Sequence, residues 1–221
     1  IPEIKRYDIS TVKGSVIVKD FSAEKFKMHL KSNKVNVIKI LPGGVVTAKD
    51  TAEIQLDENG EFVRNPEEDI VKVAVVERHQ GTGNVACGFL KGYGIKAGAV
   101  ALSIAHDSHN IIVVGVSDEE MEFAVNSLIA QEGGMVLVKE GKVIESMPMP
   151  IAGLMSDQSG EWVDEKLTAI HAKAYEELGI AGDVEPVMTL CFMSLAVIPE
   201  VKLTDMGLFD VTTFSFIPVE A

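Results

Sequence analysis

Three almost wholly apolar runs in the middle of the chain constrain its fold more than any other feature. They cover residues 71–76, 99–105 and 111–116, so each is six or seven residues long. A strand with one face in water alternates apolar and polar side chains, whereas a strand covered on both faces is apolar throughout. The runs therefore predict a sheet whose two faces are both covered by other elements.

Helices with clear boundaries are available to cover such a sheet. The clearer one follows Ser117, which forms a capping box with Glu120, and it ends before Gly133. A second helix is predicted from about Glu161 to Leu178, with apolar residues at helical spacing. Residues 135–144, between the two helices, have the pattern of a β-hairpin.

The front of the chain is richer in strand and turn signals. Within residues 1–65 we expect strands at 16–18 and 35–40 and a short helix at 22–31. A polar stretch after residue 65 suggests a boundary, with a second domain over 66–221. The predicted fold is α+β or mixed α/β: a layered sheet with at least two packed helices, preceded by a small β-rich segment.

Charge and composition exclude several classes of partner. The 221 residues contain 33 acidic and 20 basic side chains, so the formal net charge is 20 − 33 = −13. Such acidity argues against nucleic acid and against an anionic membrane surface. No run approaches the roughly 20 apolar residues of a membrane span. Two cysteines are too few for a disulfide framework, which makes the cytoplasm the expected compartment.

The most informative polar segment is His106-Asp107-Ser108-His109-Asn110, which lies between two of the apolar runs. His106 and His109 could bind a metal, with Asp107 as a third ligand or as a group that orients a histidine. One histidine could instead be a general acid or base whose tautomer is fixed by Asp107. The same residues could also simply form turns by bonding to the backbone.

A second polar segment, Glu77-Arg78-His79, follows the first apolar run. Arg78 could bind an acidic group through two hydrogen bonds. The next residues, Gly81-Thr82-Gly83, could let backbone amides approach a ligand, although glycines in tight turns are the commoner explanation. No complete nucleotide-binding or hydrolase motif accompanies either polar segment.

Read together, seven segments closely resemble the C-terminal region of bacterial and archaeal adenine deaminases of the amidohydrolase superfamily. The set includes Arg-His at 78–79, His-Asp-Ser-His-Asn at 106–110 and Pro-Ile-Ala-Gly-Leu-Met-Ser-Asp at 150–157. The other segments are 81–84, 88–92, 197–200 and 203–205. The resemblance covers nearly the whole chain, and the front piece with Ile40-Leu41-Pro42-Gly43-Gly44 looks like the segment that follows the catalytic barrel in this family.

The resemblance implies a function that this chain cannot perform alone. The family hydrolyses adenine to hypoxanthine and ammonia, in purine salvage, with iron or manganese held in a (β/α)₈ barrel. Such a barrel needs about 250 residues, and the chain has no His-x-His metal motif. We therefore expect the C-terminal portion of a longer enzyme, without a metal of its own and inactive alone. Its expected partners are its own catalytic barrel and adenine, with room for a homo-oligomer.

The resemblance carries six residues over to a site. The catalytic candidates are His106, Asp107 and His109, and the candidates for binding substrate or closing the site are Arg78, His79 and Asn110. Their roles would be to close the barrel mouth, to orient substrate or to form a subunit interface. Two alternatives stay open: a free-standing small-molecule binding or interaction module, and an independent metallohydrolase that uses the 106–110 loop.

Overall fold

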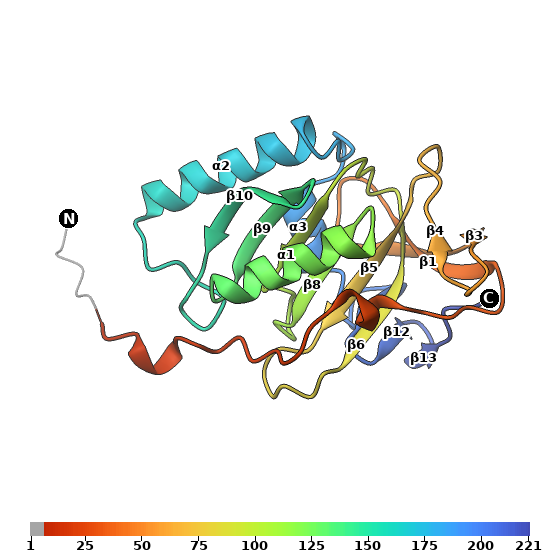
Figure 1. The fold of residues 1–221 in the computed structure, drawn as a ribbon, viewed down its shortest axis with the longest axis horizontal. Coiled ribbons are helices and arrows are strands. Elements are labelled where there is room, and N and C mark those ends of the chain that lie inside the picture. Colours follow the sequence, from red (N-terminus) through yellow and green to blue (C-terminus); the bar gives the residue numbers. More distant parts are fainter. Residues whose placement is uncertain (1–6) are drawn as a thin grey trace.

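The centre of the protein is an eight-stranded sheet, seen in a computed structural model that describes residues 7–221 (Figure 1). The strand order is β10-β9-β7-β8-β5-β6-β1-β2. β1 and β6 are parallel, and every other neighbouring pair is antiparallel. The strands are β1 (Lys34–Ile40), β2 (Thr47–Glu53), β5 (Ile70–Val76), β6 (Val85–Lys91), β7 (Ala99–Leu102), β8 (Ile111–Gly115), β9 (Gly134–Lys139) and β10 (Lys142–Pro148).

Different elements cover the two faces of this sheet. Helix α1 (Asp118–Ala130) packs on one face, against β7, β8 and β9. The other face is covered by α2 (Gly160–Glu176), α3 (Pro186–Cys191) and a small antiparallel sheet. That small sheet contains β11 (Val201–Thr204), β12 (Gly207–Asp210) and β13 (Ser215–Ile217). The predicted α+β layered fold with at least two helices is confirmed.

Strand β5 shows why the apolar runs predicted this architecture. Val71, Val73 and Val75 belong to the core cluster on the side of α2 and α3. Ala74 and Val76 belong to the cluster that includes the apolar stripe of α1. Successive side chains of a strand point to opposite faces, so a strand buried on both sides has no position for a solvated residue.

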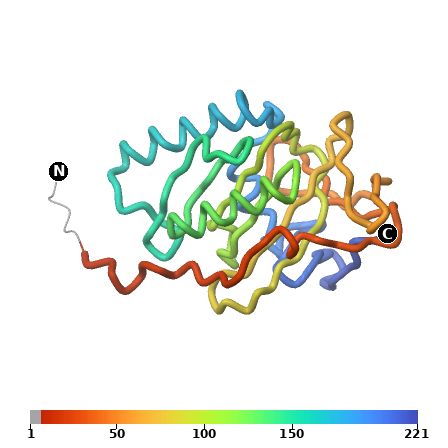
Figure 2. Tube along the Cα trace, viewed as in Figure 1, coloured from red at the N-terminus to blue at the C-terminus, as the bar shows by residue number. Residues whose placement is uncertain are grey.

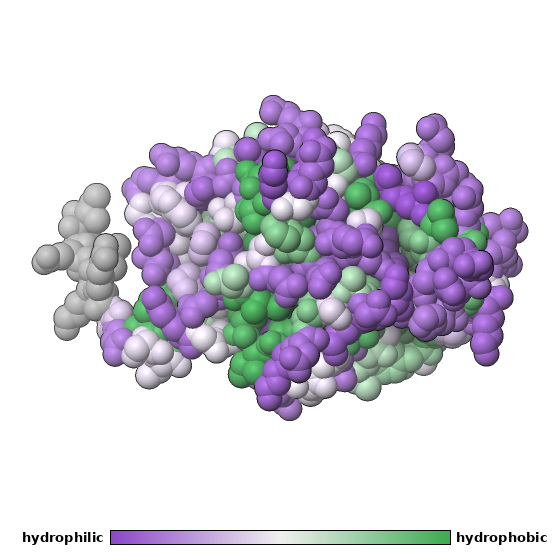
Figure 3. Space-filling model, in the orientation of Figure 1, coloured by the Kyte–Doolittle hydropathy of each residue, from purple (hydrophilic) through white to green (hydrophobic). Residues whose placement is uncertain are grey.

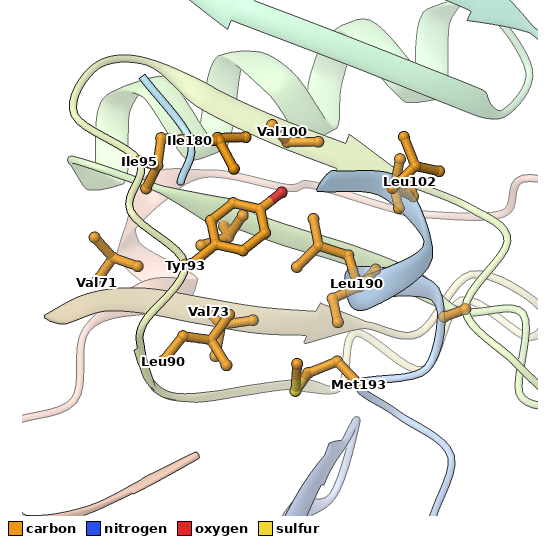
Figure 4. Packing of buried hydrophobic residues seen from close by; sticks show 14 of the residues in the cluster. Val71, Val73, Leu90, Tyr93, Ile95, Val100, Leu102, Ile180, Leu190 and Met193 are labelled. Atoms are coloured by element: carbon orange, nitrogen blue, oxygen red, sulfur yellow. The ribbon is translucent and has the colours of Figure 1, made fainter. Parts of the chain in front are cut away.

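Tyr93 lies at the centre of the larger cluster and connects the sheet to α3 (Figure 4). Its hydroxyl donates a hydrogen bond of 2.7 Å to the carbonyl of Pro186. Leu190 and Met193 point into the same cluster from α3 and the turn that follows it. The inner side of α3 is therefore fixed by apolar contacts and by one buried hydrogen bond.

The helix boundaries agree with their sequence signals. The Ser117 hydroxyl accepts a hydrogen bond from the amide of Glu120 at 3.3 Å. The Ser159 hydroxyl accepts one from the amide of Trp162, also at 3.3 Å, and starts α2. Each cap satisfies a backbone amide that has no partner within its helix. The predicted hairpin is present as β9 and β10.

Two predictions for the front of the chain are wrong. Residues 16–18 form no strand, and the helix expected at 22–31 is only a short 3-10 turn, η2 (Ala23–Phe26). After this turn the Glu61 carboxylate accepts hydrogen bonds from the amides of Met28 and His29. These long-range bonds take amides that a continuous helix would have used, so tertiary contacts override the local helical pattern.

The front segment contributes to the same sheet as the rest of the chain. Its strands β1 and β2 form one edge, and β1 pairs with β6. A separate two-stranded hairpin, β3 (Gln55–Leu56) and β4 (Phe62–Val63), follows β2. The division of the chain between residues 65 and 66 stays a prediction, and it falls between β4 and β5.

Residues 7–22, which we call the strap, run along the molecule in an extended form with a short turn at η1 (Ser10–Val12) (Figure 2). Most of the surface on the side of α1 is hydrophilic, with smaller hydrophobic patches (Figure 3). Within residues 7–221, no helix has the length and apolar character needed to cross a membrane.

Candidate functional site

Arg78 lies two residues after the end of β5 and is only 1% exposed. Its guanidinium donates to backbone carbonyls from four separate segments. The acceptors are those of His109 (2.5 Å), Ala152 (3.1 Å), Ser15 (3.4 Å) and Ser103 (3.5 Å). Burial lowers the pKa of Arg78, and the nearby charge of Glu77 partly offsets that effect. The carbonyl dipoles around it make Arg78 a clamp between loops.

Glu77 closes the turn next to Arg78. Its carboxylate accepts hydrogen bonds from the amides of His79 (2.5 Å), Gln80 (2.8 Å) and Thr82 (2.9 Å), and from the Thr82 hydroxyl (3.0 Å). Burial disfavours its charge, but these bonds outweigh that effect and lower the pKa of Glu77 to about 2. The amides of the turn are thus used within the chain.

The exposed part of the site is the loop between β7 and β8. The imidazole Nδ1 of His106 lies 2.6 Å from a carboxylate oxygen of Asp107, and both residues are exposed. The His106 ring stacks on Phe192, with centroids 5.2 Å apart and planes 15° from parallel. Its backbone amide donates to the carbonyl of Cys191 at 2.7 Å. One imidazole is therefore held in place while its edge stays open to solvent.

The remaining predicted residues surround this loop. His79 Nε2 lies 2.8 Å from the carbonyl of Ser108, and the Asn110 side chain accepts from the Arg78 amide at 3.4 Å. Burial, and then the charge of Arg78, lower the pKa of His109, which favours its neutral form. His109 Nδ1 is buried with no hydrogen-bond partner in the described part of the chain.

All six predicted residues thus meet where the central strands β5, β7 and β8 end, a region that we call the polar edge. We call Glu77, Arg78, Asn110 and the buried groups around them the floor of this polar edge. We call the exposed side chains of His79, His106 and Asp107 its rim. The rim offers an imidazole–carboxylate pair that can exchange a proton or orient a polar ligand.

Several residues of the floor are not among the predicted site residues. The Ser103 hydroxyl donates to the Gly153 carbonyl at 2.6 Å and accepts from the Gly134 amide at 2.7 Å. A Cβ on Gly153 would lie 2.8 Å from Nη1 of Arg78, so only glycine leaves room for the guanidinium. Two signals are visible in the sequence: Ser103 is a polar residue inside an apolar run, and Gly153 belongs to the segment 150–157 that carries the resemblance.

The polar edge does not have the ligand set of a metal centre. Across residues 7–221, no three His, Cys, Asp or Glu side chains come together in a way that could hold a metal ion. His106 and Asp107 pair with each other, and His109 is partly buried. The metallohydrolase alternative therefore has no complete set of protein ligands at this loop.

Comparison with known proteins assigns the chain to a family. The family model described as "Adenine deaminase C-terminal domain" matches residues 44–215. The chain belongs to this family. The adenine deaminase C-terminal domain therefore has the architecture described above, and residues 78–79, 106–110 and 150–153 of its polar edge all fall inside the matched range.

Curated relatives of this domain are similar over almost its whole length. Adenine deaminase 2 of Desulfotalea psychrophila is 66% identical over 221 residues, which are 100% of this chain and 38% of that protein. Adenine deaminase of Ligilactobacillus salivarius is 50% identical over 218 residues, 99% of this chain and 38% of that protein. The chain thus spans well under half the length of the relatives it matches.

Proposed function

We propose that this chain is the C-terminal part of a cytoplasmic adenine deaminase, which hydrolyses adenine to hypoxanthine and ammonia in purine salvage. The observation that carries the proposal is 66% identity along all 221 residues to a protein named adenine deaminase 2. The metal ions, iron or manganese, would supply an activated water in an upstream barrel. The residues of this chain would contribute the polar edge beside that barrel.

The rim is suited to close a site that holds adenine. Adenine is neutral and carries an exocyclic amine and several ring nitrogens, so it needs hydrogen-bond donors and acceptors more than charge. The Asp107 carboxylate can accept from an amine, and so can Nδ1 of a neutral His79, whose Nε2 donates to the Ser108 carbonyl. Nε2 of His106 can donate when it carries a proton. In this proposal the floor holds these groups in position and does not touch the substrate.

The course of the strap supports this placement. The Ile17 amide donates to the Arg78 carbonyl at 2.7 Å, and the Ala152 amide donates to the Val12 carbonyl at 2.9 Å. The chain that would lead back to the barrel therefore runs along the polar edge. A barrel that precedes this chain would therefore be joined to it through residues that lie on the polar edge.

The test is ammonia release from adenine, measured for the full-length protein that contains these residues and for this chain alone. We expect metal-dependent turnover only in the full-length protein. Robust turnover by the 221-residue chain would contradict the requirement for a barrel. Metal analysis of the same samples addresses the metallohydrolase alternative, which requires a stoichiometric metal that is lost on His106→Ala. Calorimetry with adenine addresses the alternative of a free-standing binding module.

A further inference from the structure

Four large apolar side chains are exposed around helix α3 and have no role in the polar edge. They come from two regions of the sequence, residues 41–46 and 188–197. We call them the α3 surface: Leu41, Val46, Met188 and Val197. Single exposed apolar residues are common, but a group of them on one surface marks an interaction site.

Leu41 and Met188 line one cavity, and backbone hydrogen bonds join the two segments that carry Val46 and Val197. A cavity of about 280 Å³ is lined by residues 40–45 on one side and by residues 183–185, Met188 and Thr189 on the other. Thr47, next to Val46, donates its amide to the Pro199 carbonyl at 3.1 Å and accepts from the Glu200 amide at 2.7 Å. Val46 is therefore one residue from Thr47, and Val197 is two residues from Pro199, with which Thr47 pairs.

The core of the domain does not use these side chains. Leu190 and Met193 form the inner contacts of α3 (Figure 4), while Met188 is 53% exposed. Two segments that resemble the adenine deaminases, 40–44 and 197–200, contribute to this surface and not to the polar edge. Their apolar, outward-facing residues are left without a structural explanation inside the domain.

The α3 surface continues the polar edge. His106 stacks on Phe192 and bonds to the carbonyl of Cys191 at the C-terminal end of α3, whereas Met188 and the cavity lie toward its N-terminal end. The six residues of α3 span about 9 Å. A stable interface covers about 800 Å² on each partner, or roughly 30 Å across, so a body seated on the rim also reaches Met188.

We propose that the α3 surface is a second contact area for the upstream part of the same polypeptide, and that an apolar patch of that part fills the cavity. This inference rests on the proposed function. The length of the relatives supports this occupant, because each of them is more than twice as long as the part that this chain covers. It also follows from the strap, in which Val12 and Ile17 bond to the adjoining polar edge.

Methionine oxidation by hydrogen peroxide tests the contact in the full-length protein without measuring activity. The peroxide transfers one oxygen atom to the thioether and leaves water, at a rate that follows exposure of the sulfur. Met188 and Met206 are 53% and 72% exposed in this domain, and Met206 lies in the β11–β12 turn. Without a contact at α3, both should therefore oxidise at rates near those of the unfolded protein.

We expect Met188 to oxidise at least about tenfold more slowly in the native full-length protein than in denaturant, and Met206 to slow much less. Protection of Met188 that does not change on dilution supports the contact. Protection that disappears on dilution assigns the surface to a second copy and overturns the proposal. An unprotected Met188 overturns it as well.

A substitution pair gives an independent measurement. Val197→Glu places a charge on the α3 surface, whereas Val143→Glu places one on the exposed β9–β10 hairpin. We expect only Val197→Glu to raise the oxidation rate of Met188, by several-fold. Equal effects of the two variants contradict the proposal. Protected Met188 in a protein that releases no ammonia from adenine would reject the proposed function and keep the contact, and the reverse result would reject the contact alone.

Discussion

The floor and the rim of the polar edge are adjacent in space but have opposite surroundings. In the floor, Glu77 and Arg78 are buried, and their charged groups bond to backbone amides and carbonyls. On the rim, His106 and Asp107 are exposed and bond mainly to each other. Charged groups used entirely by the chain stabilise loops, whereas groups left facing solvent are free to meet a ligand. Perturbing each region should therefore have a different consequence.

The largest expected effect is on stability, from Arg78→Met. Methionine keeps much of the apolar stem but leaves the carbonyls of four loop segments without their donor. We expect the free energy of unfolding to fall by about 3 to 5 kcal/mol. Arg64→Met is the matched control, because within residues 7–221 the Arg64 side chain donates to the Ile95 carbonyl alone, so its loss should cost about 1 kcal/mol. Equal losses in urea unfolding would show that Arg78 is not a clamp.

The next largest effect is expected from Gly153→Ala. Gly153 has a φ of +71°, and a Cβ there would lie 2.8 Å from Nη1 of Arg78. We expect a loss of about 3 kcal/mol, from the left-handed backbone and from displacement of the guanidinium together. Gly141 has a φ of +66° but nothing within 4 Å of its Cβ position, so Gly141→Ala should lose only about 1 kcal/mol. Similar thermal shifts for both variants would argue that Gly153 is required by its backbone alone.

The contacts of the floor cannot be predicted from the sequence. Arg78 and Asn110 were predicted as groups that bind substrate or close the site, a role that stays a prediction. Their observed partners in this domain are backbone atoms. A carbonyl such as that of Ser103 or Ala152 leaves no trace in the residue type, so a contact with it cannot be predicted from sequence. The position of the rim can be predicted from sequence, because five consecutive polar residues between two buried strands must lie at the end of a sheet.

The same distinction explains what was predicted of the fold. The central strands and both long helices have strong local patterns that agree with their tertiary surroundings. The helix expected at 22–31 had a local pattern too, but Glu61, about thirty residues away, binds the amides of Met28 and His29. Such distant contacts outweigh a weak local preference for helix, and the local sequence does not predict them.

A smaller effect, dependent on pH, is expected from Glu77→Gln. The folded-state pKa of Glu77 is about 2 and its ordinary value is 4.5. The carboxylate therefore contributes stability that is fully present above pH 4.5 and is lost as the pH falls toward 2. We expect Glu77→Gln to cost about 2 kcal/mol at pH 7 and to unfold with a weaker pH dependence between pH 5 and 2. If the free energy of unfolding falls equally with pH in the unsubstituted protein and in Glu77→Gln, Glu77 is not the source of the pH dependence.

The smallest effect on stability, but the one that matters for function, is expected from His106→Gln. His106 is exposed, and an exposed ion pair is worth about 0 to 1 kcal/mol, so unfolding of the domain should hardly change. In the full-length protein we expect turnover of adenine to fall at least about tenfold, because the rim would lose the imidazole that pairs with Asp107. His29→Gln removes another exposed histidine, which pairs with Glu61 at 3.1 Å far along the chain from the rim, and should leave turnover unchanged. Unchanged kinetics in both variants, with a lowered melting point for His106→Gln, would make the rim a structural turn like the floor beneath it.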